Sequence, residues 1–300
     1  MKKLGKEKMM AKQVLRPILD REDMPDQHIW KGYKIFDMHT HVYPEAVATK
    51  AVSALNHFYS FTAECSGTVD ELFQSAGEAG VDGFALLGVA TNPQQVEHVN
   101  EAVLRNASAA RREGFRSVAF IGMHQDYPHM REEVARAKLL GAAGVKIHPD
   151  IQKVDINDPR LCKLYGILSE ADLPVYLHMG DHRSEYRYSS PDKLVEVAKA
   201  FPKVRFIAAH LGAYRAWEES AQLIGLPNVW VDTSSVLWSL PKPQALELIR
   251  RFGTERVLFG TDYPVTTATR ELKRFFSLPL LEEERRAILW DNAAAFLGLS

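Results

Sequence analysis

The sequence predicts a (β/α)8 barrel, and three features of the chain lead to this fold class. Short apolar runs alternate with amphipathic segments along 300 residues, which indicates repeated strand–helix units. Several of these runs end in His or Asp, as expected where strand ends meet at the mouth of a barrel. The glycine-rich phosphate turn that follows the first strand of a doubly wound sheet is replaced here by residues 37–41, DMHTH.

Eight strands are expected, each a short run rich in β-branched, aliphatic and aromatic residues. They lie at 33–38, 83–88, 117–122, 143–147, 173–178, 204–209, 228–232 and 256–261. Helical patterns lie at 69–80, 93–114, 128–140, 159–171, 191–201, 216–224, 242–252 and 282–297. Proline at the first helical position and glycine at the end, as at Pro93 and Gly114, support these bounds.

Two stretches fall outside the strand–helix pattern. Residues 1–30 are expected to form an N-terminal extension that covers the bottom of the barrel or packs on a neighbouring copy. Residues 42–67 form a long first connection, which we expect to be partly helical. With no linker or internal repeat beyond the strand–helix unit, residues 31–300 are predicted to form one barrel domain.

The composition excludes several classes of protein. The formal net charge of -1 gives no basic field for nucleic acid or an anionic membrane, so the expected partner is a small-molecule substrate. The two cysteines, Cys65 and Cys162, form neither a disulfide framework nor a CxxC metal motif. No run reaches the roughly 20 apolar residues of a membrane span, and no signal peptide is visible. These features predict a cytoplasmic protein.

The strand ends carry the candidate metal ligands. His39 and His41 are two residues apart in an extended segment, so their side chains share a face. His178, His210 and Asp262 stand where the fifth, sixth and eighth predicted strands end. A single histidine at such a place is usually a packed residue, but this recurrence predicts that residues far apart in sequence converge at one mouth. Imidazoles and a carboxylate suit zinc, and manganese, iron(II) or cobalt could replace it.

The pattern resembles the amidohydrolase superfamily, and in particular the amidohydrolase-related branch that includes the aminocarboxymuconate-semialdehyde decarboxylase group. The resemblance covers residues 33–298, nearly the whole predicted barrel. The motifs that carry it are 37–41 (DMHTH), 144–149 (GVKIHP), 174–178 (PVYLH), 209–212 (AHLG) and 260–264 (GTDYP).

The resemblance implies the ligand set and the roles of the site residues. It implies one divalent metal ion, with zinc favoured, held by His39, His41, His178 and Asp262. His210 is then a residue that orients or polarises the reacting group. It also implies self-association, most simply as a homodimer.

The chemistry expected of such a site starts with a water molecule activated by the ion, since a divalent metal lowers the pKa of a bound water toward ~7. Asp262 can accept the proton of that water and return it to the leaving group, and His210 can stabilise the developing charge. The expected activity is hydrolysis of a small-molecule amide, lactone or related bond. The first alternative is non-oxidative decarboxylation of an unsaturated or aromatic carboxylate, and the second is a metal-binding barrel without catalysis.

Four further residues are candidates for contact with the substrate, and each has an alternative. Lys146 ends the fourth predicted strand, where binuclear members of the superfamily carry a carboxylated lysine; the mononuclear resemblance favours an unmodified lysine that binds an anion. His148 is expected in the pocket or in a structural role. Arg183 could clamp a carboxylate or form a surface ion pair, and Trp238 could cover an apolar substrate or pack in a loop. Asp37 either supports a metal ligand or makes a buried structural hydrogen bond.

Overall fold

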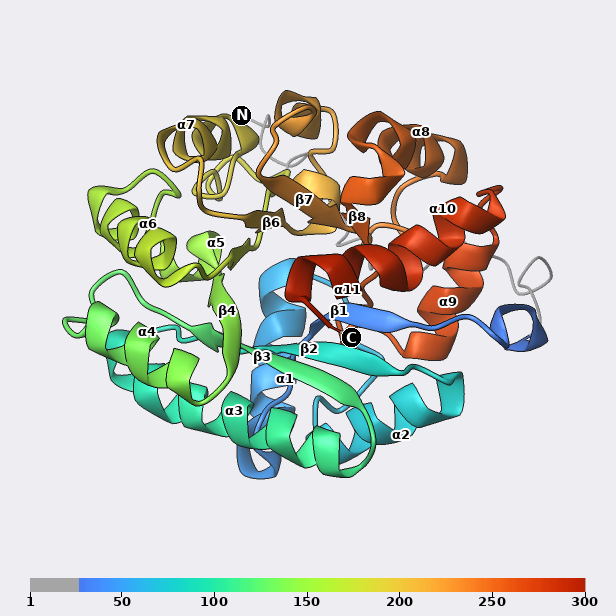
Figure 1. Cartoon of the computed structure of the whole chain (residues 1–300), viewed down its shortest axis with the longest axis horizontal. Helices are drawn as coiled ribbons and strands as arrows, with labels where there is room; N and C mark the ends of the chain where they lie inside the picture. Colours follow the sequence, from blue (N-terminus) through green and yellow to red (C-terminus); the bar gives the residue numbers. More distant parts are fainter. Residues whose placement is uncertain (1–26, 300) are drawn as a thin grey trace, which may run out of the picture.

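The computed structural model describes residues 27–299 and contains the predicted barrel. Eight parallel strands pair in sequence order, and the helices surround them (Figure 1). The strands are β1 Phe36–Thr40, β2 Gly83–Leu87, β3 Arg116–Gly122, β4 Ala142–Ile147, β5 Val175–Leu177, β6 Phe206–Ala208, β7 Val229–Asp232 and β8 Val257–Leu258. Because all strands run the same way, their carboxyl ends meet at one mouth.

The ring closes between β8 and β1, where the ladder is irregular. The Met38 amide donates to the Phe259 carbonyl oxygen at 2.8 Å, and the His41 amide donates to the Tyr263 carbonyl oxygen at 2.7 Å. Regular strand geometry in β8 ends at Leu258, so this strand is shorter than the prediction of 256–261. Beyond Leu258 the chain departs from regular strand geometry, and Asp262 lies in this irregular segment at the mouth.

The helices agree with most of the predicted ranges. They are α1 Glu45–Tyr59, α2 Val69–Ala79, α3 Val96–Arg112, α4 Met130–Leu139, α5 Pro149–Gln152, α6 Pro159–Ala171, α7 Pro191–Ala200, α8 Lys242–Phe252, α9 Ala268–Phe276, α10 Glu282–Arg286 and α11 Asn292–Leu297. Local signals set their ends, since Thr68 and Asp158 cap α2 and α6 with their side chains. None of the helices within residues 27–299 combines the length and apolar character needed to cross a membrane.

Two helical predictions need correction, and the helices α5 and α9 were not predicted. The range 216–224 contains only a short 3-10 helix, Glu219–Leu223. The range 282–297 is interrupted by a π-helical turn, Ala287–Asp291, between α10 and α11. α9 was not predicted, although Thr267 provides a side-chain cap by accepting from the Arg270 amide.

The bottom of the barrel is covered by the C-terminal helices. Trp290 and Phe296 belong to the same buried apolar cluster as Phe36 of β1, and the Phe36 and Trp290 rings lie 6.1 Å apart. Figure 1 shows α11 across this end of the ring. Trp30, at the end of the predicted extension, packs on the outer helices: its Nε1 donates to the Ala79 carbonyl oxygen of α2 at 3.0 Å, and its ring lies 5.8 Å from that of Phe276 of α9. Residues 1–26 of the extension lie outside the described part of the chain.

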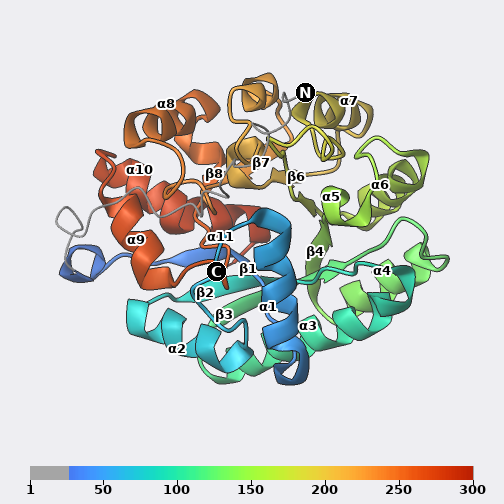
Figure 2. The same ribbon diagram turned by 180° about the vertical axis from the view of Figure 1, so that it is seen from behind.

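The first connection is partly helical, as predicted, because it contains α1. This helix crosses the mouth of the barrel, opposite the end that α11 covers (Figure 2). Within α1 only Ala48 and Val52 are buried. A helix with so little buried surface is held mainly by contacts at its inner face and its ends.

Asp37 was expected either to support a metal ligand or to make a buried structural hydrogen bond, and the structure shows buried hydrogen bonds to the backbone and to Thr261. Its carboxylate accepts from the His39 amide at 3.0 Å, the Thr261 amide at 3.0 Å and the Thr261 hydroxyl at 2.6 Å. These bonds tie β1 to the segment that follows β8.

Replacing Asp37 with Ala should therefore destabilise the barrel. The change leaves the His39 and Thr261 amides without an acceptor and the Thr261 hydroxyl with only the His39 carbonyl oxygen at 3.4 Å, which we expect to cost about 2 kcal/mol or more of unfolding free energy. Urea unfolding of the chelator-treated protein measures the loss, with Asp37→Asn as the matched control because it keeps one acceptor oxygen. An Asp37→Ala variant within about 0.5 kcal/mol of the parent would contradict this role.

Candidate metal centre

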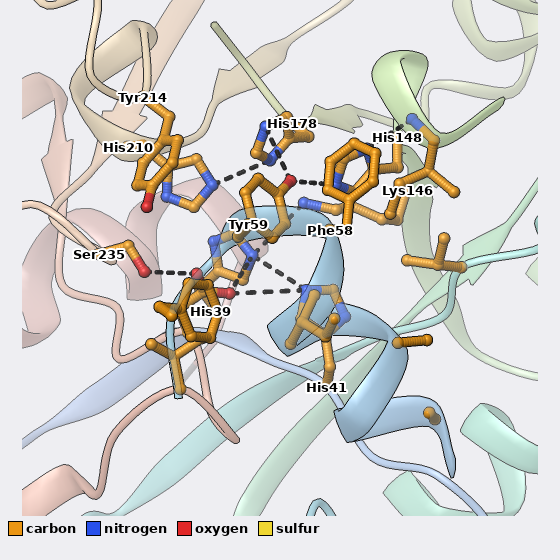
Figure 3. A pocket seen from close by; sticks show the side chains of 18 of the residues that line it. His39, His41, Phe58, Tyr59, Lys146, His148, His178, His210, Tyr214 and Ser235 are labelled. Atoms are coloured by element: carbon orange, nitrogen blue, oxygen red, sulfur yellow. Dashed lines mark hydrogen bonds and ion pairs between the residues drawn. The ribbon is translucent and has the colours of Figure 1, made fainter. Parts of the chain in front are cut away.

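A cavity of about 290 Å³ opens at the carboxyl ends of the strands, under α1. One side of it is formed by histidines, a lysine and a carboxylate from the barrel, and the other side is mainly apolar (Figure 3). The lining residues are His39, His41, Tyr43, Ala51, Ala54, Leu55, Phe58, Tyr59, Phe61, Val89, Thr91, Lys146, His148, Ile151, His178, His210, Tyr214, Ser235, Asp262 and Val265.

Three of the predicted ligands converge at the polar side of the cavity. The Nε2 atoms of His39 and His41 lie 3.1 Å apart. The Oδ1 atom of Asp262 lies 3.3 Å from the first and 3.9 Å from the second. Ligand atoms of all three residues fall within 4.8 Å of one another. This is the arrangement expected of residues that share one ion.

Hydrogen bonds orient both imidazoles as ligands. Nδ1 of His41 lies 2.9 Å from the Leu87 carbonyl oxygen, which can only accept, so Nδ1 carries the proton. Nδ1 of His39 lies 3.0 Å from Oδ2 of Asp232, which fixes its proton in the same way. Both Nε2 atoms then present lone pairs toward one another and toward Asp262. Three electron-pair donors with no proton between them fit a divalent cation such as zinc.

His178 and His210 lie next to this group. Nδ1 of His178 is 3.1 Å from Nε2 of His210, whose ring stacks on that of His39 with centroids 5.2 Å apart. The ligand atom of His178 lies within 4.8 Å of those of His148 and Asp150. It does not belong to the group formed by His39, His41 and Asp262. The place of His178 among the ligands therefore stays a prediction.

The backbone turns sharply at the two candidate catalytic residues. His210 and Asp262 have φ of 62° and 63°, in the left-handed region that non-glycine residues rarely adopt. Such positions cluster at functional sites, where the surrounding structure holds them. The close approach also requires Gly260, because a Cβ there would lie 2.9 Å from the Cβ of His39.

At His41 and Asp262 the protonation states favour metal binding, whereas Lys146 brings a positive charge to the cavity. Burial and the nearby His39 and Lys146 lower the pKa of His41 to about 3, so its imidazole is neutral. Burial alone would raise the pKa of Asp262, but His39 and His210 outweigh it and lower this pKa to about 2. Burial lowers the pKa of Lys146 to about 8, against the opposing effect of nearby carboxylates, so the amine is still mainly protonated at neutral pH.

Two of the four candidate substrate contacts line the cavity. Lys146 is buried, with Nζ 3.4 Å from Nε2 of His39 and 4.6 Å from the ring centre of Tyr176. His148 stacks on His178, with ring centroids 4.0 Å apart. Its Nε2 lies 2.8 Å from the hydroxyl of Tyr59.

The other two candidates do not line the cavity. Arg183 forms a bidentate ion pair with Asp181, and its Nη1 donates to the Phe58 carbonyl oxygen at 2.6 Å. Its guanidinium is therefore occupied in holding the end of α1. Trp238 contacts the lining residue Phe61, with ring centroids 6.4 Å apart, and the guanidinium of Arg215 lies 5.9 Å from the centre of the Trp238 ring.

Three residues that shape the site were not predicted from the sequence. Asp232 orients His39 and also accepts from the hydroxyl of Tyr176. It ends the seventh strand, so the signal that identified Asp262 was present there too. Ser235 donates to Oδ2 of Asp262 at 2.6 Å and so fixes that carboxylate. Tyr59 comes from the middle of the first connection, where no sequence pattern indicated a site residue.

A parallel barrel with two histidines and a carboxylate converging at its mouth defines a class of metal-dependent barrel enzymes. The sequence profile of the amidohydrolase family matches residues 36–299, so the chain belongs to this family. The chain is thus a metal-dependent enzyme of the amidohydrolase superfamily, and the resemblance inferred from the motifs is confirmed.

Solved structures share the fold at low identity. An uncharacterised TIM-barrel protein from Bordetella bronchiseptica matches 89% of this chain and 99% of its own, with 18% identity and a TM-score of 0.70. A probable 2-pyrone-4,6-dicarboxylic acid hydrolase from Acinetobacter baumannii matches 88% and 99%, with 16% identity and a TM-score of 0.64. A mutant 5-carboxyvanillate decarboxylase from Novosphingobium aromaticivorans, with bound manganese, matches 89% and 98%, with 15% identity and a TM-score of 0.68.

Proposed function

We propose that the chain hydrolyses an amide, lactone or related bond of a small molecule, with one divalent ion, zinc, at the mouth of the barrel. The observation that supports this most is the orientation of Asp262. Its Oδ2 accepts from Ser235 at 2.6 Å, while its Oδ1 faces the Nε2 atoms of His39 and His41. One oxygen is fixed by the protein, and the other is available to the reaction.

The residues of the chain divide the work of hydrolysis between them. When bound, the ion supplies Lewis-acid activation of a water molecule. Asp262, ionised at neutral pH, accepts the proton of the water and returns it to the leaving group. His210 has its Nδ1 2.8 Å from the Ser234 carbonyl oxygen and its Nε2 3.1 Å from Nδ1 of His178, and its ring stacks on that of His39. In this proposal His210 orients the reacting group from beside His39.

The cavity supports a compact substrate with an apolar part. Its volume of about 290 Å³ is at the low end of the roughly 300–1,000 Å³ of ligand pockets. Ala51, Leu55 and Phe58 of α1 supply much of the apolar wall. Lys146 can hold one anionic group beside the reacting bond, and no arginine among residues 27–299 lines the cavity to hold a second.

Decarboxylation of an unsaturated or aromatic carboxylate is the alternative activity. The specific feature that favours it is Lys146 beside His39, opposite the apolar wall, which together could hold a carboxylate at the reacting atom and a planar apolar body. A decarboxylase and a hydrolase both occur among the similar structures, so the fold is compatible with either reaction.

A substrate panel tests the proposal. Metal-replete protein would be assayed with small lactones, amides, esters and unsaturated carboxylates, with and without a chelator. We expect chelator-sensitive turnover with one atom of oxygen-18 from labelled water in the product and no release of CO₂. Release of CO₂ without solvent oxygen in the product would favour the decarboxylase. No turnover of any panel member by fully metal-loaded protein would favour a barrel that binds metal without catalysis.

A further inference from the structure

Arg183 attaches the end of α1 to the loop that follows β5. Its Nη1 donates to the Phe58 carbonyl oxygen at 2.6 Å, and its Nε and Nη2 donate to the two carboxylate oxygens of Asp181 at 2.9 and 2.6 Å. Asp181 is buried, and its carboxylate also accepts from the Arg183 amide at 2.9 Å. The guanidinium therefore joins the helix over the cavity to a carboxylate that is itself held in place.

The C-terminal half of α1 depends on such an attachment. The last four carbonyl groups of an α-helix have no partner within the helix, and the Phe58 carbonyl is one of them. A positive charge at this end of a helix is also favourable to the helix dipole. The two buried residues of α1, Ala48 and Val52, both lie in its first eight residues. Contacts at the end of the helix therefore decide how firmly its second half lies on the barrel.

The same guanidinium packs on the side chain of the residue that it holds. Cζ of Arg183 lies 4.7 Å from the ring centre of Phe58 and 4.1 Å from that of Tyr186, and these two rings lie 4.9 Å apart. Phe58 lines the cavity, and Figure 3 shows its ring beside His148, with ring centroids 6.4 Å apart. Arg183 thus fixes both the backbone and the ring of a residue in the apolar wall.

We propose that Arg183 is a positioning residue, which holds α1 over the cavity and so sets the affinity of the site for the apolar part of the substrate. The inference rests on the proposed function, because it assumes that the apolar wall supplied by α1 contacts the substrate. Where α1 is displaced this wall is absent, so the observed affinity falls with the fraction of molecules in which α1 is in place. The predicted metal ligands come from the strand ends and not from α1, so the rate for bound substrate should change little.

A neighbouring arginine of the same loop provides the matched control. Both Nη atoms of Arg187 donate to the carboxylate of Glu219, at 2.7 and 2.6 Å. Arg187→Met therefore removes a bidentate ion pair of this loop and leaves the bonds between Arg183 and α1 intact. An effect that is specific to the attachment of α1 should be absent from this variant.

The test is Arg183→Met, which keeps a long apolar side chain on the Phe58 ring and removes the hydrogen bonds of the guanidinium. Amide hydrogen exchange of the protein without substrate measures how often α1 opens. We expect the amides in the second half of α1 to exchange about 10–100-fold faster, as follows from loss of a hydrogen bond to a charged group. Exchange in α3 should stay at the parental rate, and exchange in α1 should do so in Arg187→Met.

A second variant keeps the test valid if the first fails to fold. Arg183→Met leaves the buried carboxylate of Asp181 without its cation, and an unpaired buried charge destabilises a protein. The double variant Asp181→Asn with Arg183→Met removes both charges at once. It should show the same faster exchange in α1.

The kinetic readout separates positioning of the substrate wall from a purely structural role. With a substrate found in the panel, KM should rise at least about threefold in Arg183→Met while kcat stays within about threefold, the pattern for binding lost equally in ground and transition states. Parental exchange of α1 in the variants that lack Arg183 would overturn the proposal, as would faster exchange with an unchanged KM. Failure of the proposed function is distinct, since it would appear as no turnover while the difference in exchange persists.

Discussion

Asp262→Asn should lose most of the turnover and keep part of the bound metal. The amide keeps the shape of the carboxylate and one oxygen toward the centre, but it cannot accept a proton at neutral pH. Loss of a group that transfers a proton typically lowers the rate by ~10²–10⁴-fold. Turnover of a substrate found in the panel, measured together with metal content, checks this prediction.

The matched control for this prediction is Ser235→Ala. It removes the bond to Oδ2 of Asp262 but leaves the carboxylate able to accept a proton. We expect a smaller loss of turnover in Ser235→Ala than in Asp262→Asn. Parental turnover in fully loaded Asp262→Asn would show that the proton is taken by another group, and the assigned role would be wrong.

Replacing His41 with Ala should remove the ion. Among residues 27–299, Nε2 of His41 is one of the three ligand atoms that lie within 4.8 Å of one another at the predicted centre. The loss of affinity should exceed the roughly 10–100-fold that follows from loss of an outer partner of a ligand. His41 is partly exposed at the mouth, so the fold should survive the change. Elemental analysis after gel filtration, together with chelator competition, measures the result.

Two further histidine variants make this test specific. His98→Ala, on the exposed side of α3, should keep its metal and serves as the control. His178→Ala tests the fourth predicted ligand, and we expect it to lose the ion as well. Full occupancy in His178→Ala with loss in His41→Ala would reduce the protein ligands to His39, His41 and Asp262. Full occupancy in His41→Ala would refute the centre itself.

The barrel was predictable from the sequence because its strands are short, buried and mostly apolar runs, and most of them are followed by an amphipathic helix. The ligand pair was predictable because period-two alternation places His39 and His41 on one face wherever the strand begins. Indeed β1 begins three residues later than predicted, at Phe36, and the two histidines still share a face. Asp262 was predictable because it follows an apolar strand.

What the sequence could not provide was the contacts across the mouth. Tyr59 lines the cavity because α1 lies over the barrel, and no local sequence pattern determines where α1 lies. Arg183 looked like a candidate for an anion, but Asp181, two residues before it, occupies its guanidinium. Whether an arginine is free to bind an anion or is paired with a carboxylate depends on its neighbours in the folded chain. The missed Asp232 is different, since its position at a strand end was visible.

The location of the ion tests the central claim most directly. Crystals of the metal-replete protein would be measured at the zinc absorption edge, and an anomalous difference map would locate each bound ion. We predict one peak per chain, in contact with Nε2 of His39, Nε2 of His41 and Oδ1 of Asp262. Within the described residues 27–299, two other groups of buried residues offer ligand atoms within 4.8 Å of one another: His39, His210 and Asp232, and His148, Asp150 and His178. A single peak at either of these groups, with none at the predicted position, would contradict the assignment.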